Sequence, residues 1–462
     1  DANSDLAKNY WKAFYAGIAK CNYLLQNMSR GEDNVAPATY AQIKAEAQFL
    51  RALYYSYLIE LYGDVPLITD VLTLETGQQP RTPKSEVVDF ILKEYTEAAE
   101  NLPSTNNPTS GRATKGAALA LKARTALYNE RWQDAISASQ AVIAMEGTEY
   151  IIEDDYSKLF KYEGQTSKEV IFSVQYLLGT KVHALYRLFG SRNALAHTNK
   201  KPAYQLADTW ECIDGKQIDK SPMFDPKHPY ENRDPRLGYT LAVSGSEFLG
   251  FQFETHGDST KCWNYMTNQR VDNLEATHAY ATFTGICWRK YANIEDKDAL
   301  NDCDMNTILI RYPEVLLTYA EAKIKAGEID ASVLEAINKV RQRPSVKMPP
   351  ITTTDPNELF YAVARERKYE FSGEGLRLFD IRRWKIAETV MNQPLLGRMK
   401  KSYPDKAPRI DEWGTAFYEG IPIAESENQQ ILKCVLSISV NSTRIEIIYG
   451  RSHISKDKPI RI

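Results

Sequence analysis

Cysteine is scarce in this chain, and long apolar runs are missing from it. The 462 residues contain six cysteines, and no two of them have the CxxC spacing of a metal or redox site. So few cysteines in so long a chain do not build a disulfide framework, and we expect free, mostly buried thiols. No apolar stretch reaches the length that crosses a bilayer, and no secretory signal peptide is present.

Charge of one sign is not in excess either. The 57 Lys and Arg residues nearly balance the 60 Asp and Glu residues, which leaves a net charge of −3. We therefore expect no binding of nucleic acid and no overall attraction to an anionic membrane. Apolar residues make up 43% and charged residues 25% of the chain, which is typical of a soluble globular protein.

Motifs that hold phosphates or metals are also lacking. There is no GxxxxGK[ST], no HExxH and no pair of histidines at i and i+4. Gly373 and Gly375 lack the third glycine of a dinucleotide fingerprint, and they follow a helical pattern instead of a strand. The acidic stretch 296–306 lacks the central glycine of a calcium loop, so we interpret it as a solvated loop that caps a helix near residue 308. We expect no cofactor, no metal and no catalytic residues.

Helical periodicity dominates the two ends of the chain. A stripe of apolar side chains with 3.6-residue spacing predicts a helix that ends at Gly63, because Pro66 prevents its continuation. Residues 118–145 and 318–343 repeat one pattern, in which two helices with small apolar residues flank a polar turn. Each is similar to a tetratricopeptide hairpin, which must stack on neighbours to bury its apolar face.

The middle of the chain has a different composition. Between about residues 150 and 305, Gly, Pro, Asn, Asp and aromatic residues interrupt the helical period, and only short strands are predicted, at 168–176 and 285–294. Long irregular segments on a rigid frame commonly carry binding residues. After residue 430, alternating polar and apolar residues on both sides of NST predict a β-hairpin.

One stretch of the irregular middle combines the residue types that recognise sugars. Sugar rings pack their C–H faces on aromatic rings, while their hydroxyl groups need amide, carboxylate or guanidinium partners. The segment KCWNYMTNQRVDN, residues 261–273, offers both kinds of group in a predicted loop. A Trp that only anchors this loop to the core is an equally good interpretation. The candidate ligand-binding residues are Trp263, Asn264, Tyr265 and Arg270, with Tyr186, Arg192 and Asn193 as a second group.

Several segments, in order along the chain, carry a resemblance to a known family. The clearest combines a helix with a Gly-Asp-Val-Pro end, and another places Glu-Arg, Glu, Gly, Arg, Phe-Asp and Arg-Arg in succession. The segments lie at 49–68, 232–237 (NRDPRL), 288–327, 366–385 (ERKYEFSGEGLRLFDIRRWK) and 421–428 (IPIAESEN). Over residues 1–430 the chain resembles the SusD/RagB family of outer-membrane nutrient-binding lipoproteins. Leu378 stands where the family usually has Trp.

The resemblance implies a mostly α fold, in which tetratricopeptide-like helix pairs support an irregular loop-rich region with a few short β-strands. We expect one SusD-like domain and an atypical tail. The helical frame would occupy 1–148 and 306–390, the ligand-binding region about 150–305, and the tail 431–462. The resemblance also implies a scaffold role, without catalysis, for Glu366, Arg367, Glu370, Gly375, Arg377, Asp380 and Arg382, whose charges would tie the chain back to the frame.

The family also implies a function. Its members capture an oligosaccharide or polysaccharide at the cell surface and pass it to a SusC-like TonB-dependent transporter in the outer membrane, without catalysis. They are attached through a lipid on an N-terminal cysteine, and we expect that anchor to precede Asp1. Three alternatives stay open. They are a peptide-binding member of the family, which the lack of aromatics at 67–82 favours slightly, an adaptor without a small ligand, and a glycosidase with two carboxylates across a cleft.

Overall fold

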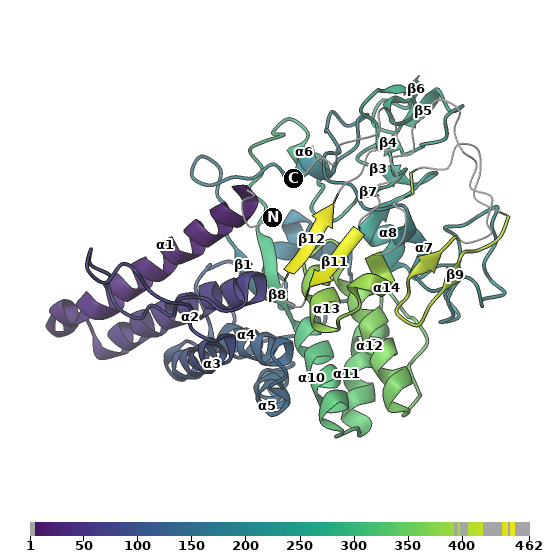
Figure 1. Ribbon diagram of the computed structural model, residues 1–462. Coiled ribbons are helices and arrows are strands. Elements are labelled where there is room, and N and C mark those ends of the chain that lie inside the picture. Colours follow the sequence, from purple (N-terminus) through teal and green to yellow (C-terminus); the bar gives the residue numbers. More distant parts are fainter. Residues whose placement is uncertain (1–4, 392–395, 398–404, 419–436, 442–443, 449–462) are drawn as a thin grey trace.

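The structure of the protein is a computed structural model that describes residues 5–391, 396–397, 405–418, 437–441 and 444–448. Helices dominate residues 5–143 and 312–391, loops with short strands form the region between them, and two strand pairs follow the last helix (Figure 1). The prediction of a mostly α fold is confirmed. The segment 421–428, which contributes to the family resemblance, lies outside the described residues.

The helical frame is one continuous row in space although it is interrupted in sequence. Helix α1 packs on α2, α2 on α3, α3 on α4 and α4 on α5, and α5 then packs on α10, which contacts α11 and α12. The two halves of the row therefore meet at the contact between α5 and α10. Its helices are α1 (Asp5–Asn27), α2 (Pro37–Tyr62), α3 (Lys84–Asn101), α4 (Lys115–Tyr128), α5 (Trp132–Ile143), α10 (Tyr312–Ala326), α11 (Ala331–Arg341) and α12 (Pro356–Phe371), and α13 (Arg377–Arg383) and α14 (Ala387–Met391) follow.

Local sequence accounts for the helical hairpins. Thr114 caps α4, because its side chain accepts a hydrogen bond from the Ala117 N–H at 3.2 Å. Most alanines of α4 are fully buried, so that α3 and α5 approach its backbone closely. Gly327 ends α10 with φ = +75°, a left-handed conformation that glycine adopts without strain. The hairpins predicted at 118–145 and 318–343 are confirmed.

A two-stranded ladder closes the base of the irregular region. Strand β1 (Val170–Val174) pairs antiparallel with β8 (Thr307–Arg311), so the chain returns to the place where it left the frame. The acidic stretch 296–306 leads into this strand, and α10 starts only at Tyr312. The expectation that the stretch caps a helix near 308 was wrong, because residues 307–311 pair with β1 and form a strand.

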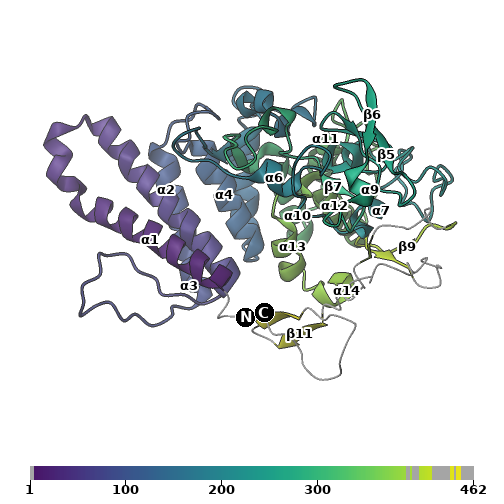
Figure 2. The same cartoon turned by 90° about the horizontal axis from the view of Figure 1, so that it is seen from above.

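Short elements make up the rest of the irregular region. Four strands form a small sheet in the order β3-β4-β5-β6, and β2 pairs with β7. The strands are β2 (Leu241–Ala242), β3 (Glu247–Phe248), β4 (Phe251–Gln252), β5 (Lys261–Asn264), β6 (Gln269–Asp272) and β7 (Cys287–Trp288). The short helices are α6 (Leu185–Phe189), α7 (Gln205–Asp208), α8 (Arg236–Thr240) and α9 (Leu274–Thr277), and 3-10 turns lie at Met28–Asn34, Lys158–Phe160, Tyr162–Thr166 and Ile294–Asp296. In the view from above, β5, β6 and α9 lie at the end of the molecule opposite α1 (Figure 2).

The C-terminal part of the described chain adds two strand pairs. Strand β9 (Arg409–Ile410) pairs with β10 (Ala416–Phe417) beside the irregular region. Strand β11 (Ser437–Asn441) pairs antiparallel with β12 (Arg444–Ile448), at the position of the predicted tail hairpin. The rest of the tail, 449–462, lies outside the described residues.

Two further expectations concern cysteines and membranes. The described cysteines, Cys21, Cys212, Cys262, Cys287 and Cys303, are all free and buried, as expected from their sparse spacing. The sixth, Cys434, lies outside the described residues. No helix in the described part of the chain combines the length and the apolar character needed to span a bilayer.

Buried charges join the irregular region to the frame. At the centre is Glu370 of α12, whose carboxylate accepts hydrogen bonds from Arg311 at 2.5 Å, Arg343 at 2.8 Å and Arg236 at 3.0 Å. All four side chains are almost completely buried. Burial alone would raise the pKa of Glu370, but Arg343, Arg311 and Arg236 lower it below the ordinary value. We call these four residues the junction network.

The junction network explains the charged motif that follows α12. Arg236 comes from NRDPRL, and it also donates to Glu366 at 2.5 Å. Beyond the helix, the chain turns at Gly373 and Gly375, whose φ values are +85° and +83°. Asp380 of α13 then pairs with Arg367 at 3.1 Å. The charges thus hold the turn against the helix, as expected of a scaffold.

A candidate ligand-binding face

The β5–β6 hairpin carries the first group of predicted residues. Trp263 and Arg270 are directly opposite each other in the ladder. The indole is half-buried and Arg270 is exposed, whereas Tyr265 at the tip of the hairpin exposes 46% of its surface. An aromatic face and a guanidinium therefore lie side by side at the edge of the molecule, where β5 and β6 project in Figure 1.

Asn264 shapes the tip of this hairpin. Its buried side-chain oxygen accepts hydrogen bonds from the N–H groups of Met266 at 3.0 Å and Thr267 at 3.2 Å. This arrangement closes the turn and leaves Tyr265 pointing outward. Asn264 therefore shapes the tip of the hairpin, since its side-chain oxygen is occupied by backbone N–H groups.

Asn193 brings the second predicted group to the same place. Its side-chain nitrogen donates to the Asp272 carbonyl at 2.8 Å, and its oxygen accepts from the Leu274 N–H at 2.9 Å. Asp272 ends β6 and Leu274 begins α9, so the loop with Arg192 lies against the end of β6. The structure thus unites residues that lie about eighty positions apart.

Tyr186 does not belong to this face. The side chain is completely buried, and its hydroxyl donates to the Ala194 carbonyl at 2.8 Å. It packs in an apolar cluster beneath the loop. A ligand does not reach this phenol, so the prediction of Tyr186 as a contact residue was wrong: helix α6 turns its polar tip inward to hold the loop.

Two exposed aromatic residues on this face were missed from the sequence. Tyr280 and Phe283 expose 67% and 49% of their surfaces. The Arg192 guanidinium lies 5.8 Å from the centre of the Tyr280 ring, and the Lys201 ammonium 4.9 Å from that of Phe283. The signal was present in the segment THAYATFTG, which spaces aromatics among small polar residues just beyond the hairpin.

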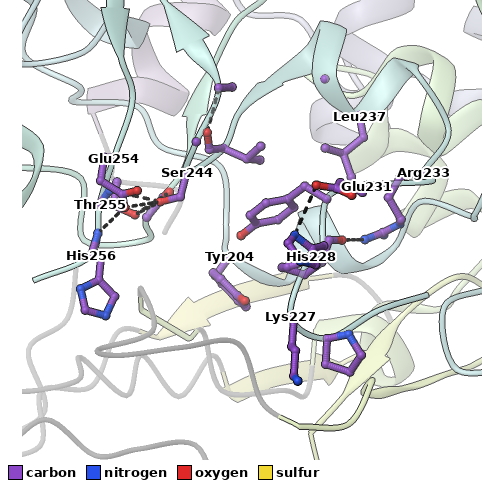
Figure 3. A pocket seen from close by; sticks show the side chains of 18 of the residues that line it. Tyr204, Lys227, His228, Glu231, Arg233, Leu237, Ser244, Glu254, Thr255 and His256 are labelled. Carbon is purple, nitrogen blue, oxygen red and sulfur yellow. Dashed lines mark hydrogen bonds and ion pairs between the residues drawn. The ribbon is translucent and has the colours of Figure 1, made fainter. Parts of the chain in front are cut away.

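A cavity of about 910 Å³ lies elsewhere in the irregular region (Figure 3). NRDPRL and the loop before it line one wall, with His228, Glu231 and Arg233. The opposite wall holds Glu254 and His256. The sequence indicates only a loop at residues 225–237, and the pairing of this loop with the segment around residue 254 follows from tertiary contacts alone.

Glu254, His228 and Glu231 each have a partner within their own wall of the cavity. Glu254 accepts hydrogen bonds from the Ser244 hydroxyl at 3.1 Å and the His256 N–H at 2.8 Å. Across the cavity, His228 and Glu231 are 3.3 Å apart. These contacts keep the two carboxylates on separate walls, and the space between them is open to a polar ligand.

Metal binding finds no support in the described residues, because no three His, Cys, Asp or Glu side chains among them converge on one point. In the acidic stretch, Asp296 and Asp304 both accept from the Tyr162 hydroxyl, at 2.7 and 3.2 Å. Asp296 is buried, which raises its pKa. The interpretation of the stretch as fully solvated was therefore wrong for Asp296, which holds the loop to η3 (Tyr162–Thr166).

Comparison with known proteins identifies the family. Residues 168–422, more than half of the chain, match the model of the SusD family. The chain belongs to this family. Residues 1–127 also match a model described as starch-binding and associating with the outer membrane.

Individual SusD relatives agree over most of the chain. SusD-like protein P25 of Formosa agariphila is 24% identical over 81% of this chain and 70% of the relative. The crystal structure of a SusD-like carbohydrate binding protein from Bacteroides fragilis is 29% identical, with a TM-score of 0.77 over 98% of this chain and 82% of that one. A laminarin binding SusD-like protein, 22% identical over 82% and 78% of the two chains, has the same fold with a TM-score of 0.61.

Proposed function

We propose that this protein captures an oligosaccharide or polysaccharide at the cell surface and passes it, without cleaving it, to a SusC-like TonB-dependent transporter of the outer membrane. The family model that describes association with the outer membrane supports this location. Attachment would be through a lipid on a cysteine that precedes Asp1. The rigid row of helices would dock on the transporter, and the loop face would hold the glycan.

The observation that carries the proposal is that side chains of the types that suit sugar recognition are grouped on the loop face. Trp263, Tyr265 and Arg270 lie on one hairpin, and Arg192 is fastened beside it through Asn193. Aromatic rings with adjacent hydrogen-bond donors suit a ring that is apolar on its faces and polar at its edge. The 29% identical relative from Bacteroides fragilis is itself described as carbohydrate binding.

The arrangement of the carboxylates supports binding over hydrolysis. A glycosidase needs two carboxyl groups that face a sugar from both sides of the scissile bond, one of them protonated. Glu254 and Glu231 are instead engaged by hydrogen bonds or a histidine in their own walls of the cavity. We therefore propose a protein that holds its ligand without chemical change.

Affinity gel electrophoresis against plant, host and microbial polysaccharides tests the proposal. The variants are Trp263→Ala and Tyr265→Ala, and the matched control is Tyr23→Ala, which removes an exposed aromatic of α1. We expect one class of glycan to retard the protein, with binding weakened about 5- to 30-fold by each hairpin variant, as expected for one stacking contact. The control should bind like the parent protein.

Other outcomes would redirect or overturn the proposal. If all three variants bind a glycan equally well, glycan capture stands, but the binding site is then expected in the cavity near His228 and His256. Release of reducing sugar, lost in Glu231→Gln or Glu254→Gln, would contradict the absence of catalysis. If no glycan binds and extended peptides do, the peptide-binding alternative replaces this proposal.

A further inference from the structure

One segment of the irregular region contains several basic residues and no acidic ones. Between Glu169 and Asp208 the sequence contains no Asp or Glu. The same interval contains Lys181, Arg187, Arg192, Lys200 and Lys201. In a chain with a net charge of −3, this is a local excess of positive charge, and its sign points to an anionic partner.

The fold gathers four of these charges, Arg187, Arg192, Lys200 and Lys201, beside the candidate face. The His197 N–H donates to the Arg187 carbonyl at 2.9 Å, and the Arg192 guanidinium donates to the His197 carbonyl at 2.8 Å. Lys200 is held to Leu188 by a backbone hydrogen bond of 3.0 Å. Residues 187–201 therefore occupy one compact loop.

These cations have no carboxylate partners within the described residues. None of Arg187, Arg192, Lys200 and Lys201 forms an ion pair there, in contrast to the arginines of the junction network. The carboxylate of Glu275 is buried under the loop and accepts a hydrogen bond from the Arg192 backbone N–H. Its carboxylate holds the backbone of the loop, while the Arg192 guanidinium donates to the Tyr280 and His197 carbonyls and has no carboxylate partner in the described part of the chain.

The neighbouring cations affect the ionisation of His197. Burial and the adjacent Arg192 and Arg187 lower the pKa of His197. Two exposed rings, Tyr280 and Phe283, complete the surface, each with a cation near its face. We call Arg192, Lys201, Tyr280 and Phe283 the basic-aromatic patch.

We propose that the basic-aromatic patch binds acidic glycans, in which a carboxylate or sulfate group of the sugar meets Arg192 and Lys201 while the rings pack on Tyr280 and Phe283. This inference rests on the proposed function, since it names the class of glycan that the loop face takes. The guanidinium is suited to both anions, because its planar N–H groups match two oxygens at once. Solvent-exposed contacts of this kind weaken as salt rises.

The test is isothermal titration calorimetry with size-matched oligosaccharides of three kinds: neutral, uronic acid-containing and sulfated. The variants are Lys201→Gln and the double change Arg192→Gln with Lys201→Gln. The control carries Lys12→Gln with Lys20→Gln on α1, which removes the same charge from an exposed surface. Thermal unfolding of each variant verifies that it is folded.

We expect at least one acidic glycan to bind tenfold or more tightly than its neutral match, with an affinity that falls as salt is raised from about 50 to about 300 mM. The double variant should reduce the preference for the acidic glycan over its neutral match tenfold or more, and Lys201→Gln alone should reduce that preference about threefold. The α1 control should match the parent. Titration with carboxyl-reduced and desulfated forms of the ligand then shows which anionic group the protein recognises.

The possible failures are distinguishable. If neutral glycans bind as tightly as acidic ones, or if the double variant and the α1 control behave alike, the inference is overturned while glycan capture stands. If no glycan of any charge binds, the proposed function fails, and the inference with it. Tight binding of acidic glycans that is lost equally in the α1 control would show nonspecific attraction, and would also overturn the assignment to the patch.

Discussion

Two regions of the molecule use arginine in opposite ways. In the junction network, Arg236, Arg311 and Arg343 are buried, and each bonds to at least two carboxylates. On the loop face, the guanidinium groups of Arg187 and Arg192 have no carboxylate partner among the described residues, and that of Arg192 donates to the backbone carbonyls of Tyr280 and His197. The residue type is the same, and the surroundings differ.

The difference follows from the cost of removing a charge from water. A buried guanidinium is tolerable only where acids and hydrogen bonds replace its hydration, so the junction network must be complete. A guanidinium at the surface keeps its hydration and remains free to exchange it for a ligand. A network of the first kind fixes geometry, and a patch of the second kind can recognise an anion.

Removing the central acid of the junction network should give the largest effect. Glu370→Gln leaves Arg236, Arg311 and Arg343 without their shared carboxylate. We expect the free energy of unfolding to fall by about 3–5 kcal/mol, the usual loss when one partner of a buried ion pair is removed. Urea denaturation followed by circular dichroism measures it.

Glu335→Gln, an exposed change on α11, is the control for this experiment and should stay within about 0.5 kcal/mol of the parent. A loss below about 1 kcal/mol for Glu370→Gln would mean that the junction network contributes little to the fold. The contrast between the two regions would then have no energetic basis.

Acid should erase the difference between Glu370→Gln and the parent. The arginines lower the pKa of Glu370 in the folded state, so its contribution is complete above the unfolded pKa of about 4.3 and is lost as pH falls toward the folded value. The gap between the two unfolding free energies should be constant from pH 7 to about 5 and should shrink below about 4.3. Urea titrations at pH 7, 5, 4 and 3 measure it, and an unchanged gap at pH 3 would contradict the sign of this shift.

A change on the loop face should give the smallest effect on stability. Arg192→Gln removes two hydrogen bonds to backbone carbonyls and no ion pair. We expect a loss of about 1 kcal/mol or less in the free energy of unfolding, against about 3–5 kcal/mol for Arg311→Gln in the same urea assay. Equal losses of unfolding free energy for the two variants would show that Arg192 is part of the scaffold. They would contradict the proposed contrast between the junction network and the loop face.

Much of the frame could be predicted, because its signals are local. The pattern around Gly327 specified two helices and a turn, and the charges that follow Glu366 indicated a scaffold motif before any partner was known. The candidate face could be predicted only in part. Trp263 and Arg270 stood in one segment with a recognisable combination of residue types, but nothing in the sequence showed that Tyr186 would turn inward.

The residues that were missed depend on contacts between distant segments. Tyr280 and Phe283 become candidate ligand contacts only because Arg192 and Lys201 lie next to their rings. These two cations are about eighty positions or more earlier in the chain. The cavity likewise needs the loop around His228 to meet the segment around His256. Neither contact leaves a periodic signal, because periodicity reports only the nearest turns of a helix or strand.

The amino-acid sequence by itself determined the helical hairpins, the glycine turn at Gly327, the irregular middle and the family resemblance. Each of these depends on neighbours within a few turns of the chain. Only the tertiary structure decided which cations are satisfied and which are free, since Arg236 meets Glu366 across 130 positions while Arg192 meets no acid through its side chain within the described residues. Burial and charge pairing are properties of the packed molecule, and the same residue type therefore serves as scaffold in one place and as a candidate ligand contact in another.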